Sequence, residues 1–195
     1  MPNRWIWHDA NSEFTWPSDT FDFIHARVLV GNIVDWRQFY KEAFRCCKPG
    51  GWMESHEPSF SWQSDLGIPE NSALGQWKKV WWEGGKKFGR TFRVVDDDLQ
   101  KKYMEEAGFV DIVVKDFKTP VGDWPLDRHQ KRIGMWSKTT LMTDIEGYIL
   151  YIWNAVMGWS REEVLVYIAH VKLQLRTKNL NPWFTRRLVY GRKPE

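Results

Sequence analysis

Residues 19–56 follow a strand–helix–strand pattern that constrains the fold more than any other part of the chain. Apolar and polar side chains alternate loosely in FDFIHAR, residues 21–27, which is typical of a central strand. Asp35 predicts the start of a helix that runs at helical apolar spacing to Pro49-Gly50-Gly51, and residues 52–56 are expected to form the next strand. Parallel neighbours require a crossover connection, so the pattern predicts a parallel β-α-β unit.

The later segments extend this unit into an α/β domain. A helix with Asp97 as its N-cap is predicted to precede a strand over residues 109–121. Ser160 and Glu163 have the S-x-x-E spacing of a capping box, which predicts a further helix, and a last strand is expected over residues 185–191.

Two segments placed after strands are predicted to be helical insertions in a single domain of residues 1–195. In the first, residues 63–90, Gly84-Gly85 is expected to break the helix. The second, residues 122–159, is expected to carry one strong helix that Gly158 ends. Substrate-binding elements of open sheets commonly lie at such positions, so we expect the two insertions to form a substrate lid.

Charge and composition argue against several classes of partner. The net charge of +3 is small, and basic residues are interspersed with acidic ones, which does not indicate a nucleic-acid surface. The five histidines are isolated and Cys46 adjoins Cys47, so no metal-ligand spacing and no ordinary disulfide is expected. The N-terminus lacks a secretory pattern and the most apolar run is too short for a membrane span, so we expect a cytoplasmic protein without a membrane partner.

Fourteen tryptophans are an unusual number for 195 residues. Large aromatic side chains line cavities for flat, apolar small molecules, but they also fill cores, and the sequence leaves both explanations open. Five aromatic residues of the two insertions are candidates for substrate binding: Trp77, Trp81, Trp136, Tyr148 and Trp153.

Four polar residues are predicted to lie at the carboxyl ends of the first two strands, where sites in open α/β sheets form. His25 and Arg27 share one face of the first strand, and Glu54 and His56 share one face of the second. A histidine beside a carboxylate can act as a general acid or base, and Arg27 can hold an anion or polarise a carbonyl. A structural role for each of these residues stays open.

The ordered set FTWPSDTFDFIHAR, CCKPGG, YMEEAGF and LVYGRKP resembles the fungal class I S-adenosylmethionine-dependent methyltransferases of secondary metabolism. The resemblance spans nearly the whole chain. It implies a Rossmann-like sheet, here truncated and carrying two helical insertions, in which the predicted strands match the family's fourth to seventh strands. It also implies that Asp9 and Ala10 lie near the adenine if the cofactor binds.

The family's glycine-rich loop and its ribose-binding carboxylate have no counterpart in this sequence, because only about twenty residues precede the first predicted strand. We therefore expect no cofactor, with S-adenosylmethionine as the alternative. Three functions remain open. The first is a cofactor-independent cyclisation, isomerisation or related rearrangement of a small apolar secondary metabolite; the second is methyl transfer with the cofactor half supplied by another chain or missing; the third is a non-catalytic partner protein.

The resemblance also implies that the strand over residues 21–27 lacks its neighbour on one side. An apolar strand with an unpaired edge recruits another strand, and the faces of the sheet are rich in tryptophan. We therefore expect an intertwined homodimer with an interface of about 2,000 Å² or more, in which residues 5–16 are the exchanged segment.

Overall fold

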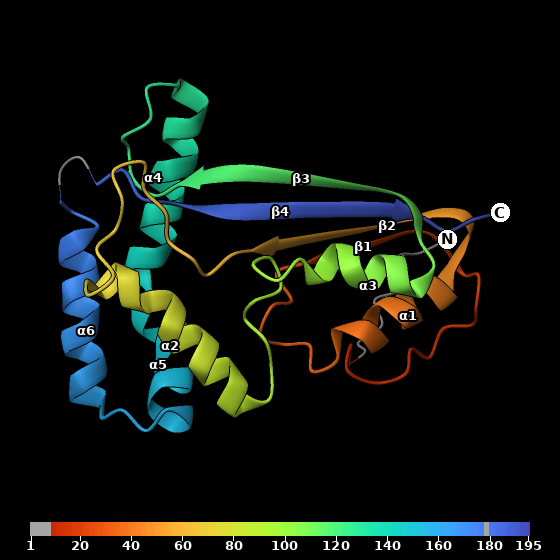
Figure 1. Cartoon of the computed structure of the whole chain (residues 1–195), viewed down its shortest axis with the longest axis horizontal. Coiled ribbons are helices and arrows are strands. Elements are labelled where there is room, and N and C mark those ends of the chain that lie inside the picture. Colours follow the sequence, from red (N-terminus) through yellow and green to blue (C-terminus); the bar gives the residue numbers. More distant parts are fainter. Residues whose placement is uncertain (1–8, 178–179) are drawn as a thin grey trace.

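The computed structural model describes residues 9–177 and 180–195, so the first part of the exchanged segment predicted over residues 5–16 lies outside the described residues. One or more helices connect each pair of successive strands along the described chain (Figure 1). The elements are β1 (Phe21–Arg27), α1 (Trp36–Cys46), β2 (Cys47–Pro58), α2 (Ala73–Phe88), α3 (Leu99–Ala107), β3 (Val110–Pro120), α4 (Arg128–Thr143), α5 (Ile145–Leu150), the π-helical turn η1 (Tyr151–Val156), α6 (Arg161–Gln174) and β4 (Trp183–Arg192).

The four strands form one mixed sheet in the order β1-β2-β4-β3. β1 and β2 are parallel, as the strand–helix–strand pattern predicts, and β4 runs antiparallel to both of its neighbours. The backbone N–H groups of Thr20 and Val28 donate to the carbonyls of Cys46 and His56. Because strand residues alternate, the backbone groups of Phe23 and the other odd-numbered residues of β1 point to the opposite edge, which no described strand covers.

Helix α1 begins where its capping residue predicts, but β2 begins earlier than expected. The Asp35 side chain accepts a hydrogen bond from the backbone N–H of Gln38, at 3.0 Å, and caps the helix as predicted. The helix ends at Cys46, and β2 already begins at Cys47 rather than after the glycines. Gly50 has φ +75, and the register between β1 and β2 shifts here, so the Pro-Gly-Gly segment forms an irregular first part of the strand.

Three further predictions need correction. Helix α2 runs unbroken through Gly84-Gly85. Gly84 serves helix packing instead: a Cβ at this position would lie 2.4 Å from Cγ2 of Ile152, so the glycine allows η1 to approach closely. The N-cap of α3 is Asp98 rather than Asp97, whose carboxylate instead pairs with Arg93. Residues 122–159 hold α4 as well as the predicted helix, which itself divides into α5 and η1.

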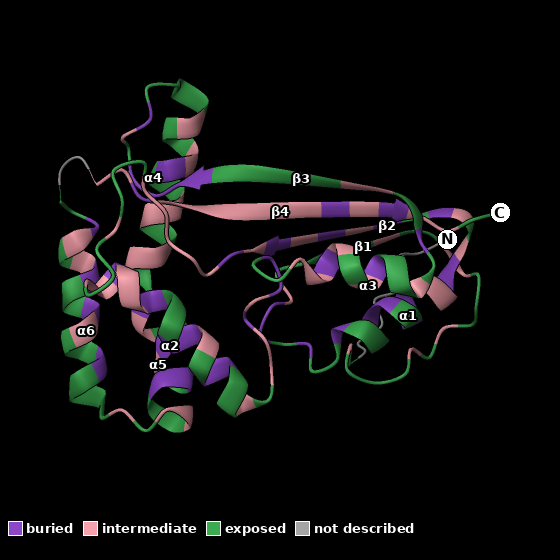
Figure 2. Cartoon of the chain, in the orientation of Figure 1, coloured by how far each residue is buried: buried purple, intermediate pink, exposed green. Residues whose placement is uncertain are grey.

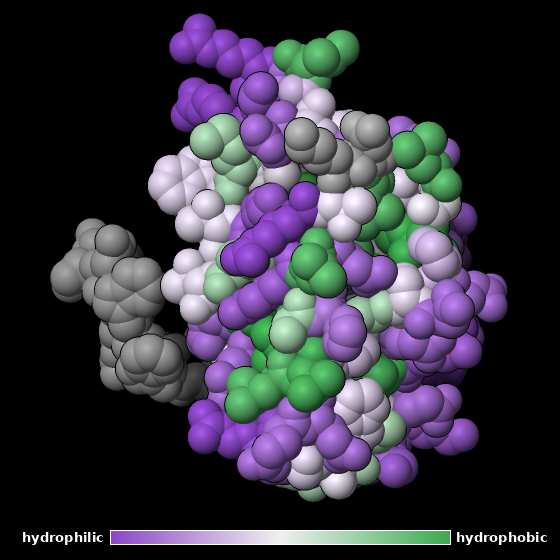
Figure 3. All heavy atoms as spheres, turned by 90° about the vertical axis from the view of Figure 1, so that its left-hand side faces the viewer, coloured by the Kyte–Doolittle hydropathy of each residue, from purple (hydrophilic) through white to green (hydrophobic). Residues whose placement is uncertain are grey.

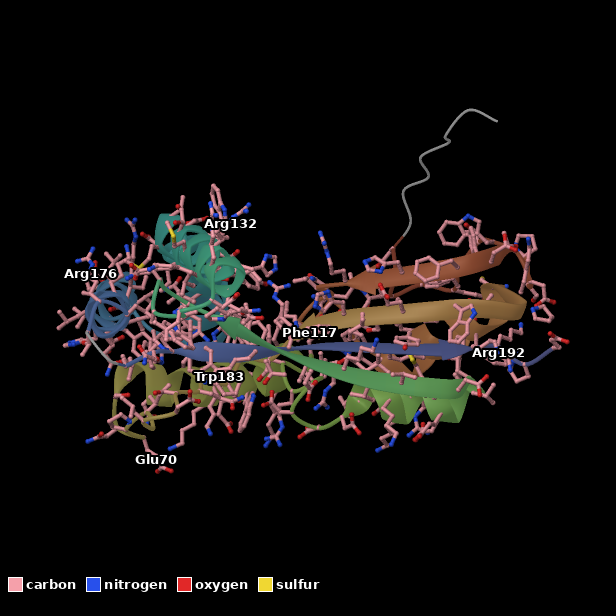
Figure 4. All side chains as sticks on the ribbon, turned by 90° about the horizontal axis from the view of Figure 1, so that it is seen from above. Glu70, Phe117, Arg132, Arg176, Trp183 and Arg192 are labelled. Carbon is pink, nitrogen blue, oxygen red and sulfur yellow. The ribbon has the colours of Figure 1, made fainter. Side chains whose placement is uncertain are left out.

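Helices cover the two faces of the sheet unequally. Seen in Figure 4, α1 and α3 lie on one side of the sheet, and the α4–α6 helices occupy the other side only at one end. Helices α2, α4, α5 and α6 form a lobe beyond the carboxyl ends of β1 and β2 (Figure 1). We call the side with α1 and α3 the covered face, and the part of the other side that no described helix covers the bare face.

Buried side chains form one cluster that runs through both the sheet half of the molecule and the lobe (Figure 2). Under α1 and α3, Tyr40, Met53 and Met104 are completely buried. In the lobe, Ile149 and Trp153 are completely buried as well. The lobe also carries exposed apolar side chains on its outer side, where Figure 3 shows them gathered, and α6 contributes three: Leu165, Val166 and Leu173. Within the described part of the chain, no helix combines the length and apolarity needed to cross a membrane.

Candidate functional site

A cavity of about 1010 Å³ lies between the lobe and the carboxyl ends of β1 and β2. Its floor is formed by side chains of the sheet, including His56, Phe184 and Arg186. Helices α2 and α4 contribute walls, and Arg132 of α4 and Phe117 of β3 both line the cavity; Figure 4 labels these two residues. Concave, largely apolar sites of this size suit a drug-sized small molecule.

Four of the five aromatic candidates of the insertions line this cavity, namely Trp77, Trp81, Trp136 and Tyr148. Trp153 does not. Its ring is fully buried in the lobe, with its centroid 5.9 Å from that of Trp77 and 4.3 Å from that of Tyr167. It packs the lobe behind the cavity wall, so its contribution to a ligand site is indirect.

The predicted pair of His25 and Glu54 forms, but it lies outside the cavity. Nδ1 of His25 and Oε1 of Glu54 are 2.8 Å apart, because the two residues are directly opposite in the β1–β2 register. Phe23 lies beside the imidazole, with ring centroids 6.3 Å apart and the planes nearly parallel. All three side chains sit on the bare face, so a histidine–carboxylate pair stands beside the open edge of β1.

His56, in contrast, belongs to the cavity. Burial lowers the pKa of its imidazole, and the nearby positive charges of Arg186 and Arg27 lower it further. The ring is therefore neutral near pH 7, and its buried Nε2 has no hydrogen-bond partner among the described residues. A neutral imidazole at the floor of a cavity can accept or relay a proton.

Arg186 is a cavity residue that sequence reasoning missed. Its position in β4 places it opposite Pro58, on the same sheet face as His56. Its guanidinium is half-buried and forms neither an ion pair nor a hydrogen bond with any described residue; burial lowers its pKa, and the charge of Arg27 adds to this effect. The available signal was the alternation of TRRLVYG, which puts one of the two adjacent arginines on each face.

Glu57 holds the rim of the cavity from the other side of the sheet. Its completely buried carboxylate accepts hydrogen bonds from the backbone N–H groups of Leu29, at 2.9 Å, and Val30, at 3.0 Å. Burial raises the pKa of this carboxyl to about 7, although the two hydrogen bonds act in the opposite direction. The contact fixes the segment that follows β1, from which Val28 reaches the cavity.

The described residues do not form a complete cradle for S-adenosylmethionine. Asp9 accepts a hydrogen bond from the backbone of Asn11, whose side chain bonds the loop after β1 at Asn32 and Val34. This turn, with Ala10, is a polar element beside the loop that follows the carboxyl end of β1. However, no described strand leads into a helix through a glycine-rich turn, and no described group of three metal-binding side chains exists.

Comparisons with known proteins agree with this architecture. The family described as "Methyltransferase domain" matches residues 4–114. "Probable methyltransferase tdiE" of Emericella nidulans is 31% identical over 188 residues, which cover 95% of this chain and 58% of that protein. "Secondary metabolism regulator laeA" of Aspergillus fumigatus is 26% identical, with 95% of this chain and 50% of that protein covered.

The chain thus spans about half the length of the curated relatives it matches. A solved structure, phosphoethanolamine N-methyltransferase 2 of Haemonchus contortus in complex with S-adenosyl-L-methionine, superposes with a TM-score of 0.51 at 16% identity. That alignment covers 96% of this chain and 36% of the solved chain. The likeness concerns the fold.

Proposed function

Because this chain belongs to the methyltransferase domain family, we propose that it supplies the acceptor-binding part of a small-molecule methyltransferase. The observation that carries the proposal is the cavity of about 1010 Å³ at the carboxyl ends of β1 and β2, walled by aromatic side chains of α2 and α4. In this proposal residues 63–90 and 122–159 form the substrate lid. The acceptor is an apolar molecule large enough to contact both insertions.

The methyl donor in this proposal is S-adenosylmethionine. The expectation that no cofactor takes part finds no support among the relatives, which are named as methyltransferases. The described residues contribute the acceptor cavity and the turn at Asp9-Ala10, and another chain supplies the remaining contacts to the donor. When bound, the donor supplies the methyl group; His56 provides a neutral base for the acceptor's proton.

Ligand titration of the 195-residue chain tests the acceptor site. We expect a neutral aromatic probe, 2-naphthamide, to change the tryptophan fluorescence saturably, because four tryptophans line the cavity. Ser137→Trp fills the cavity from α4 and should abolish this binding, whereas Lys131→Trp on the same helix, at an exposed position outside the cavity, should not. Binding that survives Ser137→Trp unchanged places the probe elsewhere and contradicts the proposal.

Calorimetric titration with S-adenosylmethionine tests the donor site separately. The isolated chain should not bind it with micromolar affinity, since the glycine-rich loop and ribose carboxylate are not among the described residues. Micromolar binding to this chain alone would show that the described turn and the strand ends suffice as a donor site.

A cofactor-independent rearrangement is the second candidate function. It is favoured by His56 and Arg186, which place a base and a cation on the cavity floor, two groups that can promote a rearrangement. Mass spectrometry of a ligand carried through purification, and of its product after incubation, separates the two candidates. A product isomeric with its substrate supports rearrangement, and a product heavier by one CH2 unit, in which a methyl group has replaced a hydrogen, supports methyl transfer.

The catalytic roles of His25, Arg27 and Glu54 stay a prediction. If these residues serve a catalytic site, His25→Ala and Arg27→Ala are expected to abolish turnover or ligand binding and to leave the melting temperature nearly unchanged, because both side chains are exposed. An equal loss of thermal stability would instead assign them a structural role.

A further inference from the structure

Apart from the phenol of Tyr148, the ionisable side chains that line the cavity are basic. The basic ones are His56, Lys118, His129, Arg132 and Arg186, and no described aspartate or glutamate joins them. The rest of the lining is largely aromatic, aliphatic or neutral polar. A largely apolar cavity that is lined by arginines and by no described carboxylate has a positive potential, and water exclusion strengthens that potential.

Among these cations, Arg186 has no acceptor for its donors. Lys118 is neutralised, because its ammonium lies 2.8 Å from the Asp65 carboxylate. The guanidinium carbon of Arg186 lies 5.6 Å from the ring centroid of Phe184, and the side chain forms no ion pair or hydrogen bond with a described residue. Leaving a half-buried guanidinium without acceptors is costly, so such a group typically marks the place of an anion.

The nearby carboxylates are committed elsewhere. Glu54 bonds His25 on the bare face, and Glu57 points to the covered side, where it binds the backbone of Leu29 and Val30. Arg27 lies opposite His56 in the register and adds a second positive charge that acts on Arg186. The floor of the cavity therefore holds Arg186, without a described partner, and the neutral imidazole of His56, and Arg27 lies beside His56 on the neighbouring strand.

We propose that this floor is an anion-binding subsite, in which Arg186 and His56 hold the carboxylate or phenolate of an aromatic ligand whose rings lie against the tryptophans of α2. A guanidinium binds a carboxylate through two parallel hydrogen bonds, and this orients the ligand as well as holding it. Arg27 at the edge of the cavity strengthens the attraction. The inference rests on the proposed function, since it gives the chemical class of the acceptor that the cavity takes.

A matched pair of probes tests the subsite on the complete 195-residue chain. The probes are 2-naphthoate and 2-naphthamide, which have the same rings and differ in charge. We expect the wild type to bind the naphthoate roughly tenfold more tightly, because the charged hydrogen bonds to Arg186 are made only by the anion. Arg186→Met should remove that preference and leave the naphthamide affinity within about twofold of the wild type.

Two further variants keep the test decisive. Arg27→Met changes an exposed side chain and should weaken naphthoate binding about threefold without affecting the fold, whether or not Arg186→Met folds. Lys115→Met, an exposed cation of β3 outside the cavity, should change neither affinity. Equal binding of both probes to the wild type overturns the anion subsite and leaves the acceptor cavity standing. Failure of both probes to bind overturns the proposed function itself.

Discussion

The two faces of the sheet differ in their surroundings. On the covered face, Met53 is completely buried, and Tyr40 and Gln100 hydrogen-bond the buried Ser55. On the bare face, Phe23 is 56% exposed and Trp52, which precedes Met53, is 37% exposed. Adjacent residues of one strand thus belong to a closed core and to an open surface. An exposed apolar surface of this kind typically marks an interaction site, so we predict that a further polypeptide segment packs against the bare face.

Matched truncations on the two faces should give the largest effect. Met53→Ala removes a completely buried side chain from the covered face and is expected to lower the free energy of unfolding by about 2–5 kcal/mol. Trp52→Ala on the bare face should cost less than about 1 kcal/mol when the chain is monomeric, because its ring is partly solvated. Urea unfolding of both variants at submicromolar protein concentration measures this. Equal losses would mean that the two faces are equally covered.

Glu57 gives the covered face a distinctive pH dependence. Its pKa is about 7 in the folded chain and 4.5 as the reference value, so its contribution to stability is present below pH 4.5 and lost as the pH rises through 7. The loss amounts to at most about 3 kcal/mol. Glu57→Gln cannot ionise and should lack this component, which the difference between wild type and variant, unfolded by urea at pH 5 and pH 8, isolates. The same difference at both pH values would contradict the raised pKa.

Local signals predicted the helix starts of α1 and α6 well. The Asp35 cap, the spacing of apolar residues in α1 and the Ser160–Glu163 capping box are all confirmed, because each depends on residues within one or two turns. Helix α4 was missed since Gly134 is its only buried residue, so the segment has no apolar stripe to reveal it.

Residues of the cavity were harder to predict than the fold. His56 was predicted from its strand-end position. Arg186 is a candidate only because no described residue near it accepts its hydrogen bonds, and this environment depends on residues that are distant in the sequence. Trp153 was misplaced because a tryptophan at helical spacing suits a cavity wall and a core equally well. The structure distinguishes them through burial, which one sequence does not encode locally.

A second copy of this chain is the cover that we predict for the bare face. The open edge of β1 and the exposed Phe23 and Trp52 are continuous, so a partner's strand could pair with the edge while its side chains cover the face. Phe23→Lys should weaken such a homodimer by about 2 kcal/mol or more, as loss of a central aromatic contact does. Leu66→Lys, an exposed apolar residue of the loop between β2 and α2, is the control and should not.

Sedimentation equilibrium measures this association. A wild-type chain that stays monomeric at micromolar concentration would contradict the predicted homodimer, including the exchange of residues 5–16. A dimer that Phe23→Lys leaves intact would locate the interface elsewhere. The exposed apolar side chains of α6 would then be the next surface to test.

The smallest expected effect concerns the lobe, where the contrast between open and closed surroundings is repeated in two tryptophans. Trp136 is 69% exposed and lines the cavity, whereas Trp153 is completely buried behind its wall. Trp136→Ala should therefore leave the free energy of unfolding within about 0.5 kcal/mol of the wild type, because a surface side chain makes few contacts. It should nevertheless weaken 2-naphthamide binding severalfold, about 1 kcal/mol, by removing one aromatic wall.

Trp153→Ala is the opposite case, because truncation of this completely buried side chain would leave an empty space inside the lobe and lower the free energy of unfolding. Fluorescence titration and urea unfolding of both variants check the pair. If Trp136→Ala destabilised the chain as much as Trp153→Ala, α4 would be part of the closed core, and the cavity would not open towards it.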